Sequence, residues 1–385
     1  MNSIFTTEFN VVYLRVIQGC NLNCDHCFTL GNKDSIKITE LSVIEKFLTS
    51  IRNNVNPQKV TFYIHGGETF LSPLHNLKSV NELIVRIFPD IKMDIIPQTN
   101  LIYKIDEEFI NFIKEEYNGT IGVSWDADIR FGSVSINKKV EQEKLFFTNL
   151  RKLIDSGIKV HIAITAQKHL LNYDPLEIVK MFDGVDSIDF ELLTTFDEQT
   201  RNLRPNNVKW AAWLYKLVQY YENNNPTWCL PQIDLFTKTL MNGKMFDCKC
   251  NCCDKRTFTL NPNGTVGLCP DMTYVEPFST VEEMFNDWQS FESKSLDLIM
   301  KKIVAQNEHV TCFECEHYDI CGGNCDASLF DDTEECPLSK SVIGHVRNNI
   351  NKFIQIYETK AKPKLTELRE NYEQDTRNYS TITDQ

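Results

Sequence analysis

The sequence predicts an α/β fold in which parallel strands alternate with outer helices. Short apolar runs alternate with segments of helical periodicity through the first 195 residues. Six such βα repeats are typical of a parallel sheet covered by helices, and either an open barrel or a doubly wound sheet satisfies the pattern. Because the ligand sites of both arrangements lie at the carboxyl ends of the strands, functional residues are expected there.

The expected strands and helices follow one another in strict alternation. The strands are Val11–Ile17, Val60–His65, Ile91–Ile96, Gly119–Trp125, Ile158–Thr165 and Ser187–Leu193. The helices between them are Leu41–Ile51, Leu77–Phe88, Glu107–Glu116, Lys144–Ser156 and Leu176–Phe182. The first helix has the clearest pattern, since Leu41, Ile44, Phe47, Leu48 and Ile51 share one face.

Beyond residue 200 the composition changes in three steps. Residues 201–244 are expected to form a helical connection, with a helix over Arg204–Asn225 whose stripe of Trp210, Trp213, Leu217 and Tyr220 is interpreted as core packing rather than as a peptide groove. Residues 245–340 hold ten of the fourteen cysteines. Residues 341–385 are expected to form a last helix, Ser341–Thr359, that ends before Pro363 and is followed by a polar tail.

Composition and charge exclude several classes of protein. A chain of 385 residues with 42% apolar and 24% charged residues can build a full core and two domains. Its 40 basic and 53 acidic residues argue against nucleic acid as a partner, because phosphate binding needs a basic face. We find no segment long and apolar enough to span a membrane and no signal peptide. A reducing cytoplasm is therefore expected, and the clustered cysteines are interpreted as metal ligands.

Three cysteines, Cys20, Cys24 and Cys27, lie within eight residues directly after the first expected strand. Three thiols in one loop can reach one centre and leave its fourth position open for chemistry. Thiolate clusters of this density hold zinc or iron–sulfur. The structural alternative is a zinc knuckle, for which His26 is the one nearby fourth ligand.

The CxxxCxxC spacing resembles the cluster loop of the radical S-adenosylmethionine (SAM) enzymes. The resemblance implies that Cys20, Cys24 and Cys27 hold a 4Fe–4S cluster whose fourth iron is chelated by SAM. His26 stands where that family usually has an aromatic residue, and it is expected near the cofactor. The resemblance also implies that the first half of the chain is a partial (β/α)6 barrel.

Further segments at strand ends resemble the SAM-binding motifs of the same family. His65-Gly66-Gly67-Glu68 resembles the segment that holds the SAM amino group, although Thr69 replaces the usual proline. Gln98-Thr99-Asn100 and Ser124 resemble two other SAM-contacting segments, in which Leu101 and Ala127 replace glycine. Arg130 follows where related enzymes carry an arginine near SAM. An ordinary glycine turn and capped strand ends are the alternatives, and Glu191 either points into the barrel or has a surface role.

The second group of cysteines resembles the SPASM domain, which carries two auxiliary 4Fe–4S clusters. Cys312, Cys315, Cys321 and Cys325 are separated by two, five and three residues, and Cys336 follows after ten more. The resemblance assigns Cys253, Cys269 and Cys325 to the first auxiliary cluster, and Cys312, Cys315, Cys321 and Cys336 to the second. The remaining ligand of the first cluster is one of Cys248, Cys250 and Cys252, with Cys248 favoured. Zinc is the alternative, because CxxC pairs also form zinc ribbons.

These resemblances imply an oxidoreductase with SAM and three 4Fe–4S clusters, in which cleavage of SAM yields a radical that abstracts hydrogen from carbon. SPASM-bearing enzymes mostly modify peptides or proteins. We expect a maturase that crosslinks side chains of a ribosomally made precursor peptide, with an external electron donor of the flavodoxin or ferredoxin type. Since no leader-binding domain is expected before the barrel, either the enzyme's own surface or a separate leader-binding protein would hold the peptide.

Several other functions remain open. Sulfatase maturation, in which Asp271 would act as base, is the main alternative, although Pro270 intervenes between Cys269 and Asp271. Thioether formation and epimerisation are others. A non-catalytic iron–sulfur electron carrier is the alternative from a different class, and it would not need the Gly66-Gly67-Glu68 segment.

Overall fold

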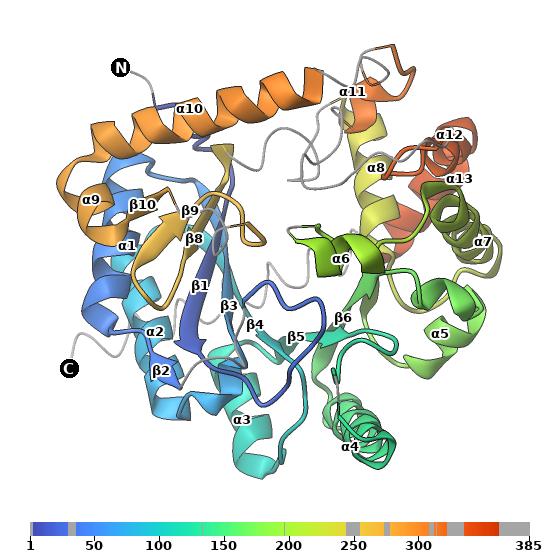
Figure 1. The fold of residues 1–385 in the computed structure, drawn as a ribbon, viewed down its shortest axis with the longest axis horizontal. Coiled ribbons are helices and arrows are strands. Elements are labelled where there is room, and N and C mark those ends of the chain that lie inside the picture. Colours follow the sequence, from blue (N-terminus) through green and yellow to red (C-terminus); the bar gives the residue numbers. More distant parts are fainter. Residues whose placement is uncertain are drawn as a thin grey trace.

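One twisted sheet organises the computed structural model of this chain (Figure 1). The structure describes residues 3–29, 36–132, 134–195, 197–243, 255–272, 278–307, 312, 314–321 and 335–361. The strands are β1 (Asn10–Gln18), β2 (Lys37–Ile38), β3 (Lys59–Gly66), β4 (Lys92–Thr99), β5 (Thr120–Trp125), β6 (Lys159–Ala166), β7 (Ser187–Leu192), β8 (Thr257–Leu260), β9 (Thr265–Gly267) and β10 (Ser279–Thr280). All six strands expected from the sequence are present.

The strand order decides between the two arrangements that the sequence left open. The sheet has the order β10-β9-β8-β1-β3-β4-β5-β6-β7, with β2 paired to β1. Strands β1, β3, β4, β5, β6 and β7 are parallel and lie in chain order. A doubly wound sheet would reverse its order at a switch point. The consecutive order, with helices on the outer side in Figure 1, is that of a partial barrel.

The barrel helices bury one face each. They are α1 (Leu41–Asn54), α2 (Leu74–Ile87), α3 (Glu107–Glu116), α4 (Ile136–Asp155) and α5 (Pro175–Met181), with short 3₁₀ turns at Thr69–Leu71 and Leu170–Asn172. In α1 the buried apolar residues are Ile44, Phe47, Leu48 and Ile51, but Leu41 is 44% exposed, so its predicted place on the buried face is wrong. Leu41 is the first residue of the helix.

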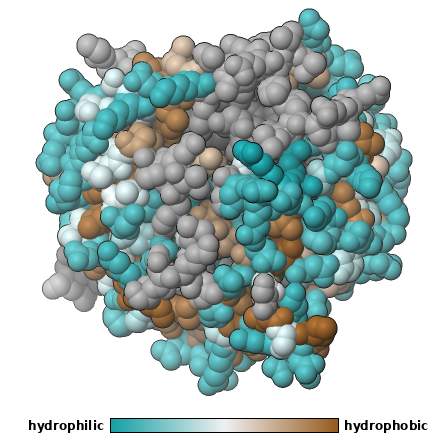
Figure 2. Space-filling model, viewed as in Figure 1, coloured by the Kyte–Doolittle hydropathy of each residue, from teal (hydrophilic) through white to brown (hydrophobic). Residues whose placement is uncertain are grey.

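Helix α4 begins eight residues before the predicted start. Ser135 caps it by accepting a hydrogen bond from the Lys138 backbone N–H, and the sequence pattern missed this turn because Ile136 and Val140 face solvent. Exposed apolar side chains of this kind are scattered over a mainly hydrophilic surface (Figure 2). No helix within the described residues is both long and apolar enough to cross a bilayer.

The tryptophan stripe of the connecting region is core packing, as predicted. It lies on α7 (Asn207–Asn224), which follows the short α6 (Glu198–Leu203). Trp210 and Trp213 are buried and stacked, and the Trp213 ring meets Phe190 of β7 at 5.0 Å between centroids. The Trp213 indole N–H donates to the Tyr173 carbonyl at 2.8 Å, which satisfies its polar end.

The sequence did not reveal the helix α8 (Pro231–Asn242), although its ends carry ordinary signals. Pro231 occupies the first turn and Gly243 ends the helix in the left-handed conformation. Nor is the last helix continuous as predicted. It consists of α12 (Lys340–Asn348) and α13 (Ile350–Ile356), followed by a π-helical turn at Tyr357–Ala361.

The cysteine-rich part is joined to the barrel by strand pairing. Strand β8 lies parallel to β1, with Val12 opposite Phe258, and β8, β9 and β10 continue antiparallel. Phe5 packs on Phe258 at 4.8 Å between ring centroids. The remaining helices of this part are α9 (Val281–Asn286), α10 (Trp288–Asn307) and α11 (Tyr318–Cys321). The sheet is therefore continuous across the predicted domain boundary.

Candidate functional site

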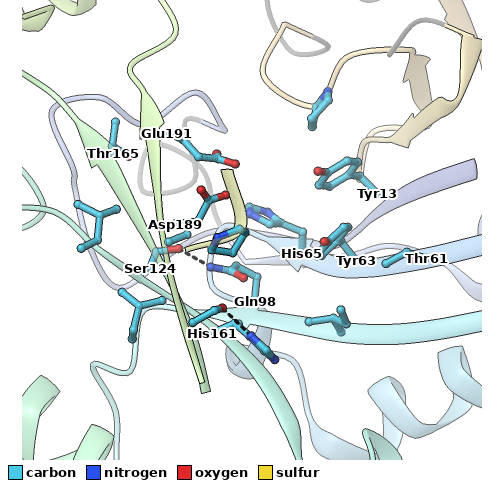
Figure 3. A pocket seen from close by; sticks show the side chains of 18 of the residues that line it. Tyr13, Thr61, Tyr63, His65, Gln98, Ser124, His161, Thr165, Asp189 and Glu191 are labelled. Carbon is cyan, nitrogen blue, oxygen red and sulfur yellow. Dashed lines mark hydrogen bonds between the residues drawn. The ribbon is translucent and has the colours of Figure 1, made fainter. Parts of the chain in front are cut away.

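A cavity of about 670 Å³ occupies the inner side of the barrel sheet. Its walls come from alternate residues of the parallel strands, because successive side chains of a strand point to opposite faces. Figure 3 shows Tyr13, Tyr63 and His65 on one side of this space and Asp189 and Glu191 of β7 on the other. The volume is that of a small-molecule site, which is commonly 300–1,000 Å³.

The three-cysteine loop lies at the carboxyl end of β1, at the place expected for a site. Cys20, Cys24 and Cys27 are all partly exposed free thiols. The Cys27 N–H donates to the Cys24 carbonyl at 3.2 Å, and the Asp25 N–H donates to the Ile129 carbonyl at 3.1 Å. The loop is thus folded on itself and held against the segment that follows β5.

These thiols fit an iron–sulfur centre in chemical type. Burial raises the pKa of Cys20 to about 11, and that of Cys24 still further, and the neighbouring Cys27 thiol adds to both shifts. Without a cationic centre to bind them, the Cys20 and Cys24 thiols therefore stay protonated. As placed in the described residues, no three His, Cys, Asp or Glu side chains converge as tightly as a bound metal requires. The ligand role of Cys20, Cys24 and Cys27 remains a prediction.

The two glycines after β3 allow this loop to touch the cysteine loop. A Cβ atom on Gly67 would lie 2.0 Å from the Gly19 carbonyl oxygen, and one on Gly66 would lie 2.6 Å from the Ile17 oxygen. In their place two backbone bonds of 3.0 Å form, from the Gly67 N–H to Ile17 and from the Glu68 N–H to Gly19. The close approach of two backbones explains both glycines.

Glu68 joins its own loop to the end of β4 through its buried carboxylate. It accepts hydrogen bonds from the Thr99 hydroxyl at 2.8 Å, the Asn100 N–H at 2.7 Å and the Phe70 N–H at 3.1 Å. Burial raises its pKa to about 7 in spite of these donors. The Asn100 side chain donates in turn to Cys20 Sγ at 3.6 Å. The structure therefore brings Glu68, Thr99 and Asn100 to the cysteine loop, while their contacts with SAM remain predictions.

Ser124 lies on the cavity wall and is held by a residue from the next strand. Its hydroxyl accepts a hydrogen bond from Gln98 Nε2 at 2.7 Å (Figure 3). Gly122 makes room for this bond, because a Cβ atom there would lie 2.0 Å from Gln98 Oε1. The sequence singled out Ser124 but missed the supporting roles of Gln98 and Gly122.

His26, Asp126 and Arg130 form a buried ionic group beside the cysteine loop. Asp126 Oδ2 lies 2.8 Å from the Arg130 guanidinium and 3.3 Å from His26 Nε2, and Oδ1 accepts from the Thr165 N–H at 2.7 Å. Burial alone would raise the pKa of Asp126, but Arg130 and His26 together hold it well below its usual range. His26 is thereby fixed by Asp126 on the cavity wall, as is Arg130.

Replacing Arg130 by methionine is expected to destabilise the protein by about 3–5 kcal/mol, because the buried Asp126 carboxylate would lose its main counter-charge. The matched control is Lys59→Met, since Lys59 pairs with Asp94 at 3.3 Å where both side chains are 27% exposed, and this change should cost about 1 kcal/mol or less. Urea unfolding of both variants measures the difference. Equal small losses for the two would contradict the ionic group described above.

Asp271, the candidate base, does reach the cavity. Its Oδ2 accepts a hydrogen bond from the Thr194 hydroxyl at 2.6 Å, just beyond the end of β7. Glu191 also lines the cavity and is exposed there, which agrees with the prediction that it points into the barrel. Thr194 and Arg15 are cavity residues that the sequence analysis missed.

The C-terminal cysteines are only partly described. Cys269, Cys312, Cys315, Cys321 and Cys336 are partly exposed, whereas Cys248, Cys250, Cys252, Cys253 and Cys325 lie outside the described residues. The Cys315 N–H donates to the Cys312 carbonyl at 3.2 Å, so this pair forms a turn. Burial raises the pKa of Cys336 to about 12, with a further contribution from the nearby Cys321. Both predicted auxiliary clusters remain predictions.

Solved structures share this architecture, whereas no protein-family model and no curated protein sequence matches the chain. Native anSMEcpe with bound AdoMet and Cp18Cys peptide is similar with a TM-score of 0.64 and 19% identity, over 94% of this chain and 99% of that chain. Streptococcus suis SuiB bound to S-adenosylmethionine is similar with a TM-score of 0.55 and 13% identity, over 85% of this chain and 77% of that chain. SuiB bound to the precursor peptide SuiA is similar with a TM-score of 0.53 and 14% identity, over 83% of this chain and 72% of that chain.

The chain therefore shares the fold of anSMEcpe and SuiB, a partial barrel of parallel strands followed by a C-terminal part that extends the same sheet. This confirms the fold class predicted from the sequence. The resemblance inferred from the cysteine and glycine motifs is confirmed in the fold, while the likeness in sequence is low throughout.

Proposed function

We propose that this chain is a radical SAM enzyme that oxidises side chains of a ribosomally made precursor peptide and thereby forms a crosslink. The observation that carries the proposal is the convergence of the cysteine loop, the glycine loop with Glu68, and the Asp126–Arg130 pair at the carboxyl ends of the barrel strands. Bound AdoMet in anSMEcpe and SuiB, and a precursor peptide in SuiB, support it. A cytoplasmic enzyme with an external one-electron donor and a separate leader-binding protein is part of the same proposal.

In this proposal Cys20, Cys24 and Cys27 hold the SAM cluster, and Gly66, Gly67, Glu68, Thr99, Asn100, Ser124, His26 and Arg130 surround SAM. When bound, the cluster and SAM supply a radical able to take a hydrogen atom from carbon. The chain itself orients the peptide and excludes water. To form the crosslink, the substrate radical would lose one further electron, for which an auxiliary cluster held by the C-terminal cysteines would be the acceptor, and one proton, for which the Asp271 carboxylate on the cavity wall would be the acceptor.

The test is anaerobic turnover of reconstituted protein with SAM, a reductant and the precursor peptide encoded beside its gene. We expect 5′-deoxyadenosine and a peptide lighter by about 2 Da per crosslink, because two hydrogens are lost. Deuterium uptake from solvent without a mass loss in ordinary water would mean epimerisation. Absence of 5′-deoxyadenosine would leave only the electron-carrier function.

Sulfatase maturation is the second candidate, and the position of Asp271 favours it. The carboxylate faces the cavity in spite of Pro270, held by Thr194 at 2.6 Å. Oxidation of a single cysteine or serine in a sulfatase peptide, with no new ring, would identify this reaction in place of crosslinking.

The acidic β7 wall predicts a basic side chain in the substrate peptide. Asp189 and Glu191 line the cavity two residues apart on one face of β7, opposite the stacked Tyr13 and Tyr63 rings (Figure 3). A carboxylate attracts the charged end of a lysine or arginine, and aromatic rings pack against the aliphatic stem of such a side chain.

Glu191→Gln is therefore expected to raise the KM of a lysine- or arginine-containing peptide about tenfold, which corresponds to about 1.4 kcal/mol. Because charge is the cause, the KM of the same peptide with norleucine in place of the basic residue should stay unchanged. Glu141→Gln on the exposed face of α4 is the control. Equal effects on both peptides would contradict the proposed contact.

A further inference from the structure

Arg15 is a buried cation in the middle of strand β1, between the two cysteine-bearing parts of the chain. Its side chain lines the cavity and the residue is 1% exposed. The guanidinium carbon lies 5.2 Å from the centroid of the Phe28 ring, which directly follows Cys27. Burial and the Arg15 charge lower the pKa of the facing His65 to about 3, so that ring stays neutral. Arg15 therefore supplies a permanent cation next to the cysteine loop.

The same guanidinium reaches across to the C-terminal part. One terminal NH2 group donates to Asn261 Oδ1 at 2.6 Å, and the other donates to the Pro270 carbonyl. Asn261 belongs to the turn between β8 and β9. Its backbone N–H donates to the Thr265 carbonyl, and its side-chain amide donates to the Thr265 hydroxyl at 2.9 Å. Pro270 stands directly between Cys269 and Asp271.

We propose that Arg15 is a positioning residue that fixes the Cys269–Asp271 segment, and with it the Asp271 carboxylate, on the cavity wall. This inference rests on the proposed function, in which Asp271 accepts the proton released during oxidation. Asp271 is held at two points, by Arg15 through the neighbouring carbonyl and by Thr194 through its own Oδ2. Two tethers from opposite edges of the barrel, β1 and the end of β7, fix both the segment and the carboxylate.

The fork geometry of the guanidinium explains why an arginine occupies this position. Its planar N–H groups bind two acceptors at once, here an amide oxygen and a carbonyl oxygen from different loops. A lysine ammonium keeps the charge but not the fork, so Arg15→Lys separates geometry from charge. Without the fork, the Asp271 carboxylate should shift, and a displacement of about 1 Å can slow a reaction up to a hundredfold. We therefore expect the rate loss in the step that uses Asp271.

The experiment compares Arg15→Lys with Arg52→Lys, in which the substituted arginine is a partly exposed residue of α1 that pairs with Asp90. We expect Arg15→Lys to lower the yield of modified peptide per 5′-deoxyadenosine at least tenfold, while 5′-deoxyadenosine formation itself falls about twofold or less. Arg52→Lys should alter neither. In an Asp271→Asn background Arg15→Lys should cause no further loss of yield, because both changes act through the same carboxylate. A full additional loss in that background, or an unchanged yield, would overturn the inference.

Hydrogen exchange gives a readout that needs no turnover. Amides of residues 259–271 should exchange faster in full-length Arg15→Lys than in Arg52→Lys, with β4 and β5 unaffected. If Arg15→Lys does not fold, Asn261→Ala removes one acceptor of the fork and should accelerate the same amides. Unchanged exchange there overturns the positioning role, whereas absence of 5′-deoxyadenosine in the unmutated protein overturns only the proposed function.

Discussion

Replacement of Cys20, Cys24 and Cys27 together by alanine will remove about four iron atoms per chain and abolish cleavage of SAM. The reason is local, because all three thiols belong to one loop at the end of β1 and the resemblance assigns the whole SAM cluster to them. The fold should survive, since the three cysteines belong to a loop after β1, and Cys20 and Cys24 touch the core only as partly buried residues. Iron analysis, 5′-deoxyadenosine formation and the far-ultraviolet circular dichroism spectrum measure the three expectations.

Cys229→Ala is the matched control for iron content. Cys229 is a buried cysteine that lies outside the predicted ligand sets. The Cys229→Ala protein should retain close to twelve iron atoms per chain, the number that three 4Fe–4S clusters contain. A triple variant that still cleaves SAM, or an unmutated protein that binds only zinc, would refute the radical SAM assignment.

Local sequence patterns predicted the barrel strands well, because each strand buries alternate apolar residues in the core whatever its neighbours are. Strand β6 (Lys159–Ala166) begins and ends one residue after its expected range. Helix α3 matches its expected range, Glu107–Glu116. The strand order did not follow from such patterns. It depends on which edges pair, and both a barrel and a doubly wound sheet bury the same residues.

The site was predictable where chemistry requires unusual residue spacing. The cysteine loop and Gly66-Gly67-Glu68 were found because few structures need three thiols or two adjacent glycines there. Arg15 and Thr194 were missed for the opposite reason. A single arginine within an apolar strand has no local signal, and its partners Asn261 and Pro270 follow about 250 residues later. Long-range hydrogen bonds of this kind are determined by tertiary structure alone.

Gly67→Ala is expected to abolish SAM cleavage although it adds a single methyl group. That group would lie 2.0 Å from the carbonyl oxygen of Gly19 and 2.4 Å from its carbonyl carbon. Neither atom belongs to a flexible side chain, so the glycine loop and the cysteine loop must move apart. The two backbone hydrogen bonds that join the loops would then lengthen, and Cys20, next to Gly19, would shift with them. We expect a loss of about 1–3 kcal/mol in stability from overpacking.

The control for this change is Gly157→Ala at the end of α4. Gly157 has a φ of +76°, and a Cβ atom there would meet no atom within 4 Å. Alanine at 157 therefore carries backbone strain of about 1–2 kcal/mol without any collision. The two variants should lose similar stability, but only Gly67→Ala should lose SAM binding, measured by equilibrium dialysis, and 5′-deoxyadenosine formation. The two variants are matched in stability, so any difference in SAM cleavage reports on the contact between the two loops. Equal cleavage by both variants would mean that this contact has no part in the chemistry.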